Sequence, residues 1–386
     1  MAKQGLSEFI NVSRWAAAFL VLFGHVSHLI LVDYKYVVEK SIFCKLLYFL
    51  AGFGHEAVMV FFVISGYLVG ALTLDKWKQS GPNIQAYASA RISRIYTVLL
   101  PALMVGLALD YIGISWVNAS ELYTNSAQYN TNSLFFTIGT ALNFNVLIGN
   151  IFQLQGILVK TLGSNSPLWS LANEWWYYII FALVGVALTT TSRNKKIVCA
   201  LLAVTIAALL PTIMLVLGGV WALGFLANAW LHSSFWRPHP ILGIGFFVVV
   251  VVLARLNHQG DFQTYDESVI AETFRGYLVG FAYVVALVSA NSIQKIPLKR
   301  FNQLLAEFSY TSYLTHFPAM VFIVAFAYQF LGIQFQVQPS IYGLLYTLIL
   351  VIILYAYSYV FSLLTEQHTF AVRKKIDVYF KKTLGH

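Results

Sequence analysis

Two ionisable residues, Arg14 and His25, stand in the first apolar stretch of the chain, where lipid would make both costly. They are eleven residues apart, so a helix brings both side chains to one face, roughly 16 Å apart along the axis. An arginine there would bind phosphates, and a buried neutral histidine would take a proton as a general base. Because intramembrane charges usually face a bundle interior or a wet cavity, the shared face predicts one common cavity.

A second basic pair, Arg91 and Arg94, lies one helical turn apart in "RISRIYTVLLP". Guanidinium forks suit phosphates, so a pair at this spacing can hold a polyphosphate. The alternative is a charge signal that orients the neighbouring span. For Arg14 the simpler alternative is a side chain that reaches the cytoplasmic headgroups, and for His25 it is a histidine that only packs.

Four more polar residues lie in otherwise apolar stretches. Ser65 stands in "EAVMVFFVISGYLVG". The alternative interpretation is that the small residues Ser65 and Gly66 only permit close helix packing. Glu174 lies at the expected outer mouth of a span in "SPLWSLANEWWYYIIF", and Tyr313 and His316 lie in "SYTSYLTHFP". We predict no metal site, because neither the histidines nor the two cysteines have ligand spacing.

The composition indicates that membrane helices position these residues. The chain has 386 residues, 59% hydrophobic and only 10% charged, too few charges to cover a water-soluble protein of this size. Apolar runs of about 20 residues each span a bilayer. We therefore predict an all-α polytopic helical bundle with about ten transmembrane helices, near residues 9–31, 56–74, 95–113, 172–190, 197–217, 219–232, 240–255, 271–290, 304–330 and 341–364.

The basic residues predict the orientation of these spans and explain the net charge of +9 without nucleic acid as a partner. If Lys3 is cytoplasmic, the even-numbered loops should be basic, and they hold Lys76, Lys78, Arg91, Arg94, Arg193, Lys195, Lys196, Arg237, Lys295, Lys299 and Arg300. Both termini are therefore expected in the cytoplasm and the protein in the cytoplasmic (plasma) membrane. The first run lacks a cleavage site and is expected to remain as an uncleaved span.

We expect a single transmembrane domain over residues 1–370 and a basic cytoplasmic tail over residues 371–386. Within the domain, residues 114–171 are rich in Asn, Ser and Tyr and then become amphipathic. This segment is too polar for a clean span, so it is expected to be extracytoplasmic or re-entrant. An extra pair of spans there would leave the remaining orientation unchanged.

Five stretches in order resemble the membrane-bound acyltransferase-3 family: "RWAAAFLVLFGH", "FFVISGYL", "RISRIYTVLLP", "LWSLANEWWYY" and "SYTSYLTHFP". The resemblance covers nearly the whole chain. It implies an enzyme that transfers acyl groups, commonly acetyl, to extracytoplasmic glycans, glycolipids and related acceptors. Some relatives carry a fused esterase-like domain after the membrane part, so a separate partner protein is one expectation here and a homo-oligomer another.

The resemblance also implies roles for the residues singled out above. Acyl-coenzyme A, with acetyl as the usual acyl group, would be a co-substrate rather than a tightly bound cofactor. Arg14, Arg91 and Arg94 would hold its phosphates, and its pantetheine arm would carry the thioester toward His25. His25 would act as general base on the acceptor hydroxyl.

Glu174 is expected in the catalytic site, where it would orient His25, balance its charge or bind the acceptor sugar. Ser65, Tyr313 and His316 would line the channel or stabilise the developing oxyanion. We favour direct transfer over an acyl-enzyme on Ser65 or on a histidine.

Two other classes of protein fit part of the pattern. A polytopic transporter or flippase would also carry intramembrane charges, although carriers often show internal repeats and this chain shows none that we recognise. A non-catalytic polysaccharide-assembly or sensory protein on the same scaffold is the other alternative. The sequence does not identify the acceptor among polysaccharides, lipid-linked glycans, peptidoglycan, glycolipids and small molecules.

Overall fold

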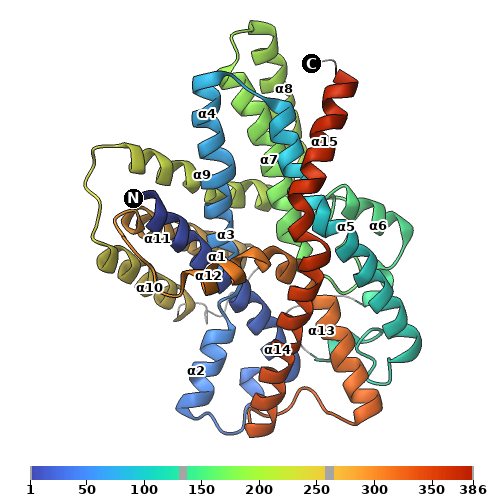
Figure 1. The fold of residues 1–386 in the computed structure, drawn as a ribbon. Helices are drawn as coiled ribbons and strands as arrows, with labels where there is room; N and C mark the ends of the chain where they lie inside the picture. The colour runs from blue at the N-terminus through green and yellow to red at the C-terminus, as the bar shows by residue number, and fades with distance from the viewer. Residues whose placement is uncertain (1, 130–136, 257–264, 385–386) are drawn as a thin grey trace. The chain divides into compact units, whose positions relative to one another are not determined.

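The computed structural model describes residues 2–129, 137–256 and 265–384 (Figure 1). In this part of the chain the regular structure is helical, with extended pairing limited to isolated β-bridges. Eight segments of the described residues are helical, long and apolar enough to cross a membrane: Gln4–Ile30, Ile42–Ser80, Ile84–Trp116, Leu168–Thr189, Thr212–His232, Ile270–Ala290, Ser309–Leu331 and Ile341–Thr383. The protein is therefore an all-α polytopic membrane protein, which confirms the predicted fold class.

The eight spans of the described residues differ from the expected set mainly between residues 193 and 256. Helix α8 (Arg193–Leu209) has 17 residues and begins with three basic side chains. Helix α10 (Pro240–Leu256) also has 17 residues. A helix of this length is about 25 Å long, which is shorter than the hydrocarbon core of a bilayer at about 30 Å. The boundary predicted at residue 218, between the spans 197–217 and 219–232, is wrong. Proline has no N–H and holds the preceding residue extended, so the break falls at Pro211, before α9 (Thr212–His232).

The chain forms two compact units. The first unit comprises residues 1–17, 55–84 and 173–306, and the second comprises residues 18–54, 85–172 and 307–386. The expected boundary between a domain at 1–370 and a tail at 371–386 stays a prediction. The last two residues of that tail lie outside the described residues.

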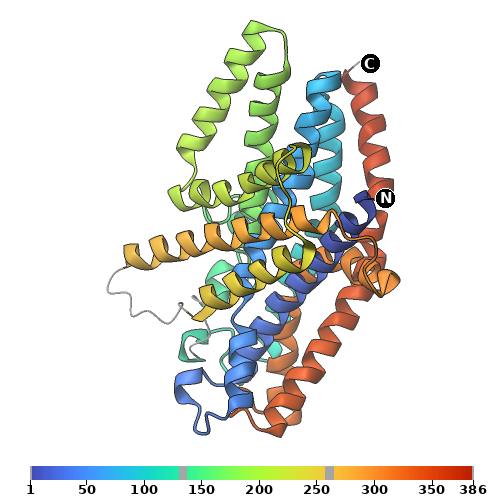
Figure 2. The same ribbon diagram turned by 90° about the vertical axis from the view of Figure 1, so that its left-hand side faces the viewer.

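The first unit holds the first part of α1 (Ala2–Ile30) and most of α7 (Leu168–Thr189). Its other helices are α3 (Gly54–Ser65), the π-helical segment η2 (Gly66–Ala71), α4 (Leu72–Ser80), α8, α9, α10, α11 (Tyr265–Ala290) and α12 (Lys299–Glu307). Figure 2 shows α7 and α8 as a hairpin. Helix α9 packs against η2 and α11, and α11 packs against α10.

Glycine is required where η2 meets α9. A Cβ atom at Gly66 would lie 1.8 Å from the main-chain oxygen of Trp221, so only glycine lets the two backbones approach this closely. π-Helical turns within α-helices are frequent at functional sites. Ser65, which the sequence analysis singled out, is the residue immediately before this segment.

The second unit holds the rest of α1, the short helices η1 (Tyr34–Tyr36) and α2 (Ile42–Ala51), and nearly all of α5 (Ile84–Trp116). Its later helices are α13 (Ser309–Leu331), α14 (Ile341–Leu364), η6 (Glu366–His368) and α15 (Thr369–Leu384). Helix α13 packs against α14, and η6 joins α14 to α15 (Figure 1). The core of this unit includes Leu22, Val26, Phe317, Val321, Leu350 and Leu354.

The segment 114–171 contains short helices between long ones: η3 (Ser126–Tyr129), η4 (Ile138–Ala141) and α6 (Phe144–Ile151). Residues 130–136 of it lie outside the described residues. The fully buried Asn150 fastens its second half, since Nδ2 donates to the Lys160 carbonyl at 2.9 Å and Oδ1 accepts from the Leu162 N–H at 3.1 Å. Its expected extracytoplasmic or re-entrant position stays a prediction.

Candidate active site

Two histidines meet in the second unit, although 291 residues separate them in the chain. Nδ1 of His25, on α1, lies 2.9 Å from Nε2 of His316, on α13. Nδ1 of His316 lies 2.8 Å from the main-chain oxygen of Ser312, one turn earlier. His316 is fully buried and His25 is partly buried. We call Ser312, His316 and His25 the histidine chain.

A proline in α13 ties this helix to the loop before α7. Pro318 has no N–H, so the carbonyl oxygen of Leu314 loses its usual donor four residues later. The side chain of Asn165 supplies the missing donor, because its Nδ2 lies 2.9 Å from that oxygen. The loop is therefore hydrogen-bonded to α13 within one turn of His316.

Tyr313 adds a second link between the same loop and the same helix. It precedes His316 by three residues and so shares its face of α13. Its hydroxyl oxygen lies 2.7 Å from Oγ of Ser170 and donates to the carbonyl oxygen of Pro167 at 3.2 Å. The hydroxyl of Tyr313 thus holds the start of α7 beside the histidine chain.

A buried carboxylate anchors the other side of this loop. Asp110, on α5, is 1% exposed and accepts hydrogen bonds from the N–H and the hydroxyl of Ser164, at 2.7 and 2.8 Å. The preceding residue, Gly163, has φ of +55°, and a Cβ there would lie 2.0 Å from Oδ2 of Asp110. A glycine is therefore needed for the carboxylate to reach the loop.

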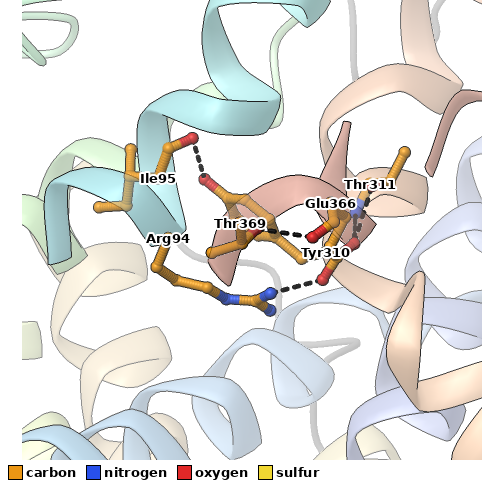
Figure 3. Close-up of polar contacts among 6 residues, drawn as sticks. All are labelled: Arg94, Ile95, Tyr310, Thr311, Glu366 and Thr369. Carbon is orange, nitrogen blue, oxygen red and sulfur yellow. Dashed lines mark hydrogen bonds and ion pairs between the residues drawn. The ribbon is translucent and has the colours of Figure 1, made fainter. Parts of the chain in front are cut away.

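Arg94 is already paired with a carboxylate in the second unit (Figure 3). Its Nη1 lies 2.5 Å from Oε1 of Glu366, and its guanidinium lies over the ring of Tyr310, 4.8 Å from the ring centre. Arg91, one turn earlier on α5, lies 5.9 Å from the ring centre of Tyr87. One guanidinium of the predicted phosphate-binding pair, that of Arg94, is thus shared with a buried acid.

The same glutamate holds the start of α13. Oε2 of Glu366 accepts from the N–H of Thr311 at 3.0 Å and from its hydroxyl at 2.7 Å. A carboxylate in this position satisfies a free N–H of the first turn and interacts favourably with the helix dipole. Glu366 therefore joins α5, α13 and the junction of α14 with α15 (Figure 3).

The first unit contains a separate series of hydrogen bonds. Nε1 of Trp221 donates to Oγ of Ser65 at 3.1 Å, and Oγ of Ser65 lies 3.1 Å from Oη of Tyr178. Oη of Tyr178 in turn donates to Oε1 of Glu174. We call Trp221, Ser65, Tyr178 and Glu174 the carboxylate chain. Because the proton of Tyr178 goes to the carboxylate, the hydroxyl of Ser65 donates to Tyr178.

A family model for an acyltransferase domain matches residues 7–364 of the chain. The chain belongs to the acyltransferase-3 family. A relative of this acyltransferase-3 protein, an uncharacterized protein of Haemophilus influenzae, is 31% identical over 157 residues. That alignment covers 40% of the present chain and 58% of the relative. No solved structure matches the chain significantly.

The acyltransferase-3 chain distributes the expected site residues over both units. His25, His316 and Tyr313 gather in the second unit, which also holds the Arg91 and Arg94 pair. Ser65 and Glu174 belong to the first unit, where one tyrosine joins them. Arg14 lies partly buried on the part of α1 that belongs to the first unit. The cavity expected between Arg14 and His25, and the role of each residue in catalysis, stay predictions.

Sequence reasoning missed two carboxylates that hydrogen-bond around the candidate site, Asp110 and Glu366. Asp110 gave a signal, since it is an acid inside a predicted span and such residues are by default functional. Glu366 gave none. It lies two residues beyond the family match and just after the last predicted span, where acids in contact with headgroups are ordinary.

Proposed function

We propose that this protein is a membrane O-acyltransferase. It moves an acyl group, most simply acetyl, from acyl-coenzyme A to a hydroxyl of an extracytoplasmic carbohydrate or glycoconjugate. Family membership supports acyl transfer. The observation that carries the proposal is the contact of His25 with His316 among apolar helices. One fully buried and one partly buried imidazole are costly there and serve proton transfer well.

In the proposed reaction His25 takes the proton of the acceptor hydroxyl while that oxygen attacks the thioester carbonyl carbon. A C–O bond forms, and the carbonyl π electrons move onto the carbonyl oxygen. When the tetrahedral intermediate collapses, the carbonyl re-forms and the C–S bond breaks. Coenzyme A leaves as the thiolate and takes the proton from the His25 imidazolium, which gives the ester, the free thiol and neutral His25.

The arginines would bind the donor. Arg14, Arg91 and Arg94 are proposed to hold the phosphates of acyl-coenzyme A, each through its planar fork. The pairing of Arg94 with Glu366 supports an oriented fork, since one N–H is fixed and the others keep a defined direction. This arrangement would favour a donor with a fixed phosphate geometry over simple counter-ions.

The acceptor would meet Glu174. Its carboxylate accepts one hydrogen bond from Tyr178 and has further acceptor positions that suit sugar hydroxyls. We propose that Glu174 faces the outside of the cell and that both termini lie in the cytoplasm. The protein would then reside in the cytoplasmic membrane. The basic even-numbered loops support that orientation.

The test uses inverted membrane vesicles with labelled acetyl-coenzyme A on their cytoplasmic face and a glycan acceptor inside. We expect label in the glycan with the wild type and with His28→Ala, and none with His25→Ala at equal protein level. His28 is the matched control, because it is a histidine on the same helix. Label in neither the wild type nor the control, with folded protein and several acceptors supplied, would favour a transporter.

A further inference from the structure

We infer that His316 fixes the tautomer of His25, so that Nε2 of His25 is the atom that takes the proton from the acceptor. The inference rests on the proposed function for its catalytic meaning. The tautomer itself follows from the hydrogen bonds of the histidine chain. His316 is a positioning residue here, since it acts through His25 rather than on the substrates.

The carbonyl of Ser312 fixes which nitrogen of His316 carries the hydrogen. A main-chain oxygen only accepts hydrogen bonds, so Nδ1 of His316, at 2.8 Å, must carry the hydrogen. A neutral imidazole has a single N–H. Nε2 of His316 is therefore left with a lone pair and accepts.

The hydrogen shared by the two rings belongs to His25. Because Nε2 of His316 accepts, Nδ1 of His25, at 2.9 Å, must donate. The rings are nearly parallel, at 9°, and their centres are 5.2 Å apart. The distance between the ring centres exceeds the N–N distance by about two ring radii, so both nitrogens lie on the line that joins the centres. The two rings therefore lie in one plane and meet at their edges. An N–H bond also lies in the plane of its ring, so the N–H of one ring points at the nitrogen of the other.

The reverse arrangement would need a doubly protonated His316. Both of its nitrogens would then donate, and a full positive charge would stand on a side chain with no exposed surface. An isolated buried charge without an anionic partner is strongly disfavoured. Among the described residues, the hydrogen-bond partners of His316 are main-chain groups of Ser312 and Tyr313 and the imidazole of His25, none of which is an anion.

The other ring nitrogen of His25, Nε2, is left to accept a proton. With its hydrogen on Nδ1, neutral His25 has its lone pair on Nε2. The ring is held by the hydrogen bond to His316 and by Phe317, whose ring lies perpendicular to it at 81° and 5.1 Å. After Nε2 takes a proton, Nδ1–H still donates to His316, which stabilises the imidazolium without a second buried charge.

Nuclear magnetic resonance of the full chain in lipid nanodiscs tests the tautomer independently of activity. Histidine labelled with nitrogen-15 reports which ring nitrogen carries the hydrogen, and His25→Gln assigns the His25 signals. We expect the Nδ1–H form at His25 in the wild type and a mixture or the Nε2–H form in His316→Leu. An Nε2–H form at His25 in the wild type would overturn the inference, whether or not the protein transfers acyl groups.

Kinetics then separate positioning from packing. In His316→Gln the side-chain oxygen can still accept from His25, so we expect kcat to fall less than in His316→Leu. In His316→Leu it should fall roughly 10–100-fold, as when the outer hydrogen-bond partner of a functional histidine is removed. The donor KM should change little in either variant, and His28→Gln should behave as the wild type. Equal losses in the Gln and Leu variants, with both proteins folded, would contradict the positioning role. A wild type without transfer would instead refute the proposed function and leave the tautomer to the spectra.

Discussion

The hydrogens of the histidine chain and of the carboxylate chain both point toward a group that can only accept, but the two series leave different groups available to the substrates. In the second unit, the hydrogens point from His25 through His316 toward the carbonyl of Ser312 and leave a lone pair at the free end. In the first unit, they point from the indole of Trp221 through two hydroxyls toward Glu174 and end on a carboxylate. A group that can only accept fixes each direction, the carbonyl of Ser312 in one series and the carboxylate of Glu174 in the other.

Neither series needs a buried ion pair to hold its polar end. A neutral histidine and a hydroxyl group can each donate one hydrogen bond and accept another. When a neighbour fixes one of these roles, the other role is fixed as well. The first series yields a base, and the second yields an oriented anion. Substitutions at the ends should therefore affect different kinetic constants, and those inside the series should have smaller effects.

The largest effect is expected at the free end of the histidine chain. His25→Gln keeps a polar side chain of similar length but cannot take up a proton. We expect kcat to fall roughly 10²–10⁴-fold, the usual contribution of a general base. Single-turnover transfer from preloaded donor measures this step apart from binding. A donor affinity that falls in parallel with the rate would instead make His25 a binding residue.

The free end of the carboxylate chain should affect binding of the acceptor. Glu174→Gln removes the charge but keeps the hydrogen bond from Tyr178, so the acceptor KM should rise roughly 10-fold, as for loss of one charged hydrogen bond. The donor KM and kcat should stay within about 3-fold. Initial rates with acceptor and donor varied in turn measure both. A loss confined to kcat would place Glu174 beside the reacting atoms and erase the contrast between the two series.

A further test asks whether the arginine pair depends on its acid. Glu366→Gln weakens the contact with Arg94 and one of the bonds to Thr311, so the donor KM should rise about 5-fold and stability should fall about 1–2 kcal/mol. Arg94 is 33% exposed, and solvent reduces what the pair contributes. Binding of desulfo-coenzyme A and thermal unfolding in detergent provide the readouts. The exposed Glu307, at the end of α12, is the matched control, and Glu307→Gln should be silent.

The smallest effect is expected inside the carboxylate chain. Ser65→Ala removes a hydrogen-bond link but leaves Tyr178 on Glu174, so transfer should fall about 3-fold or less, in keeping with one neutral hydrogen bond. Acyl label should not remain on the protein after denaturation in the wild type or the variant. Complete loss of transfer with Ser65→Ala, and trapped label on wild-type Ser65, would make this residue a nucleophile.

The fold class could be predicted because it depends on local composition. Apolar runs of bilayer length and the shortage of charges follow directly from the sequence, and the structure confirms the helical, polytopic chain. The junction near Pro211 was misplaced because hydrophobicity continues through it without a polar signal. The break depends on one missing N–H, which a count of apolar residues does not register.

Several residues of the candidate site could be singled out from the sequence, but not their partners. His25 and His316 were recognised separately, because each is an ionisable residue in an apolar run. Their contact joins helices 291 residues apart, and no spacing along the chain specifies it. The same holds for Arg94 and Glu366, whose pairing depends on how α5, α13 and α14 pack within the second unit.

The hydrogen bond between Asn165 and Leu314 also has a consequence for biogenesis. Asn165 is synthesised 149 residues before Leu314, so its side chain lacks this acceptor until α13 has been made. The bond can form only after both segments have been inserted, which makes it a late step of assembly. An Asn165→Leu chain should therefore be inserted normally at the translocon and then be degraded by membrane quality-control proteases, with a shortened half-life in pulse-chase experiments.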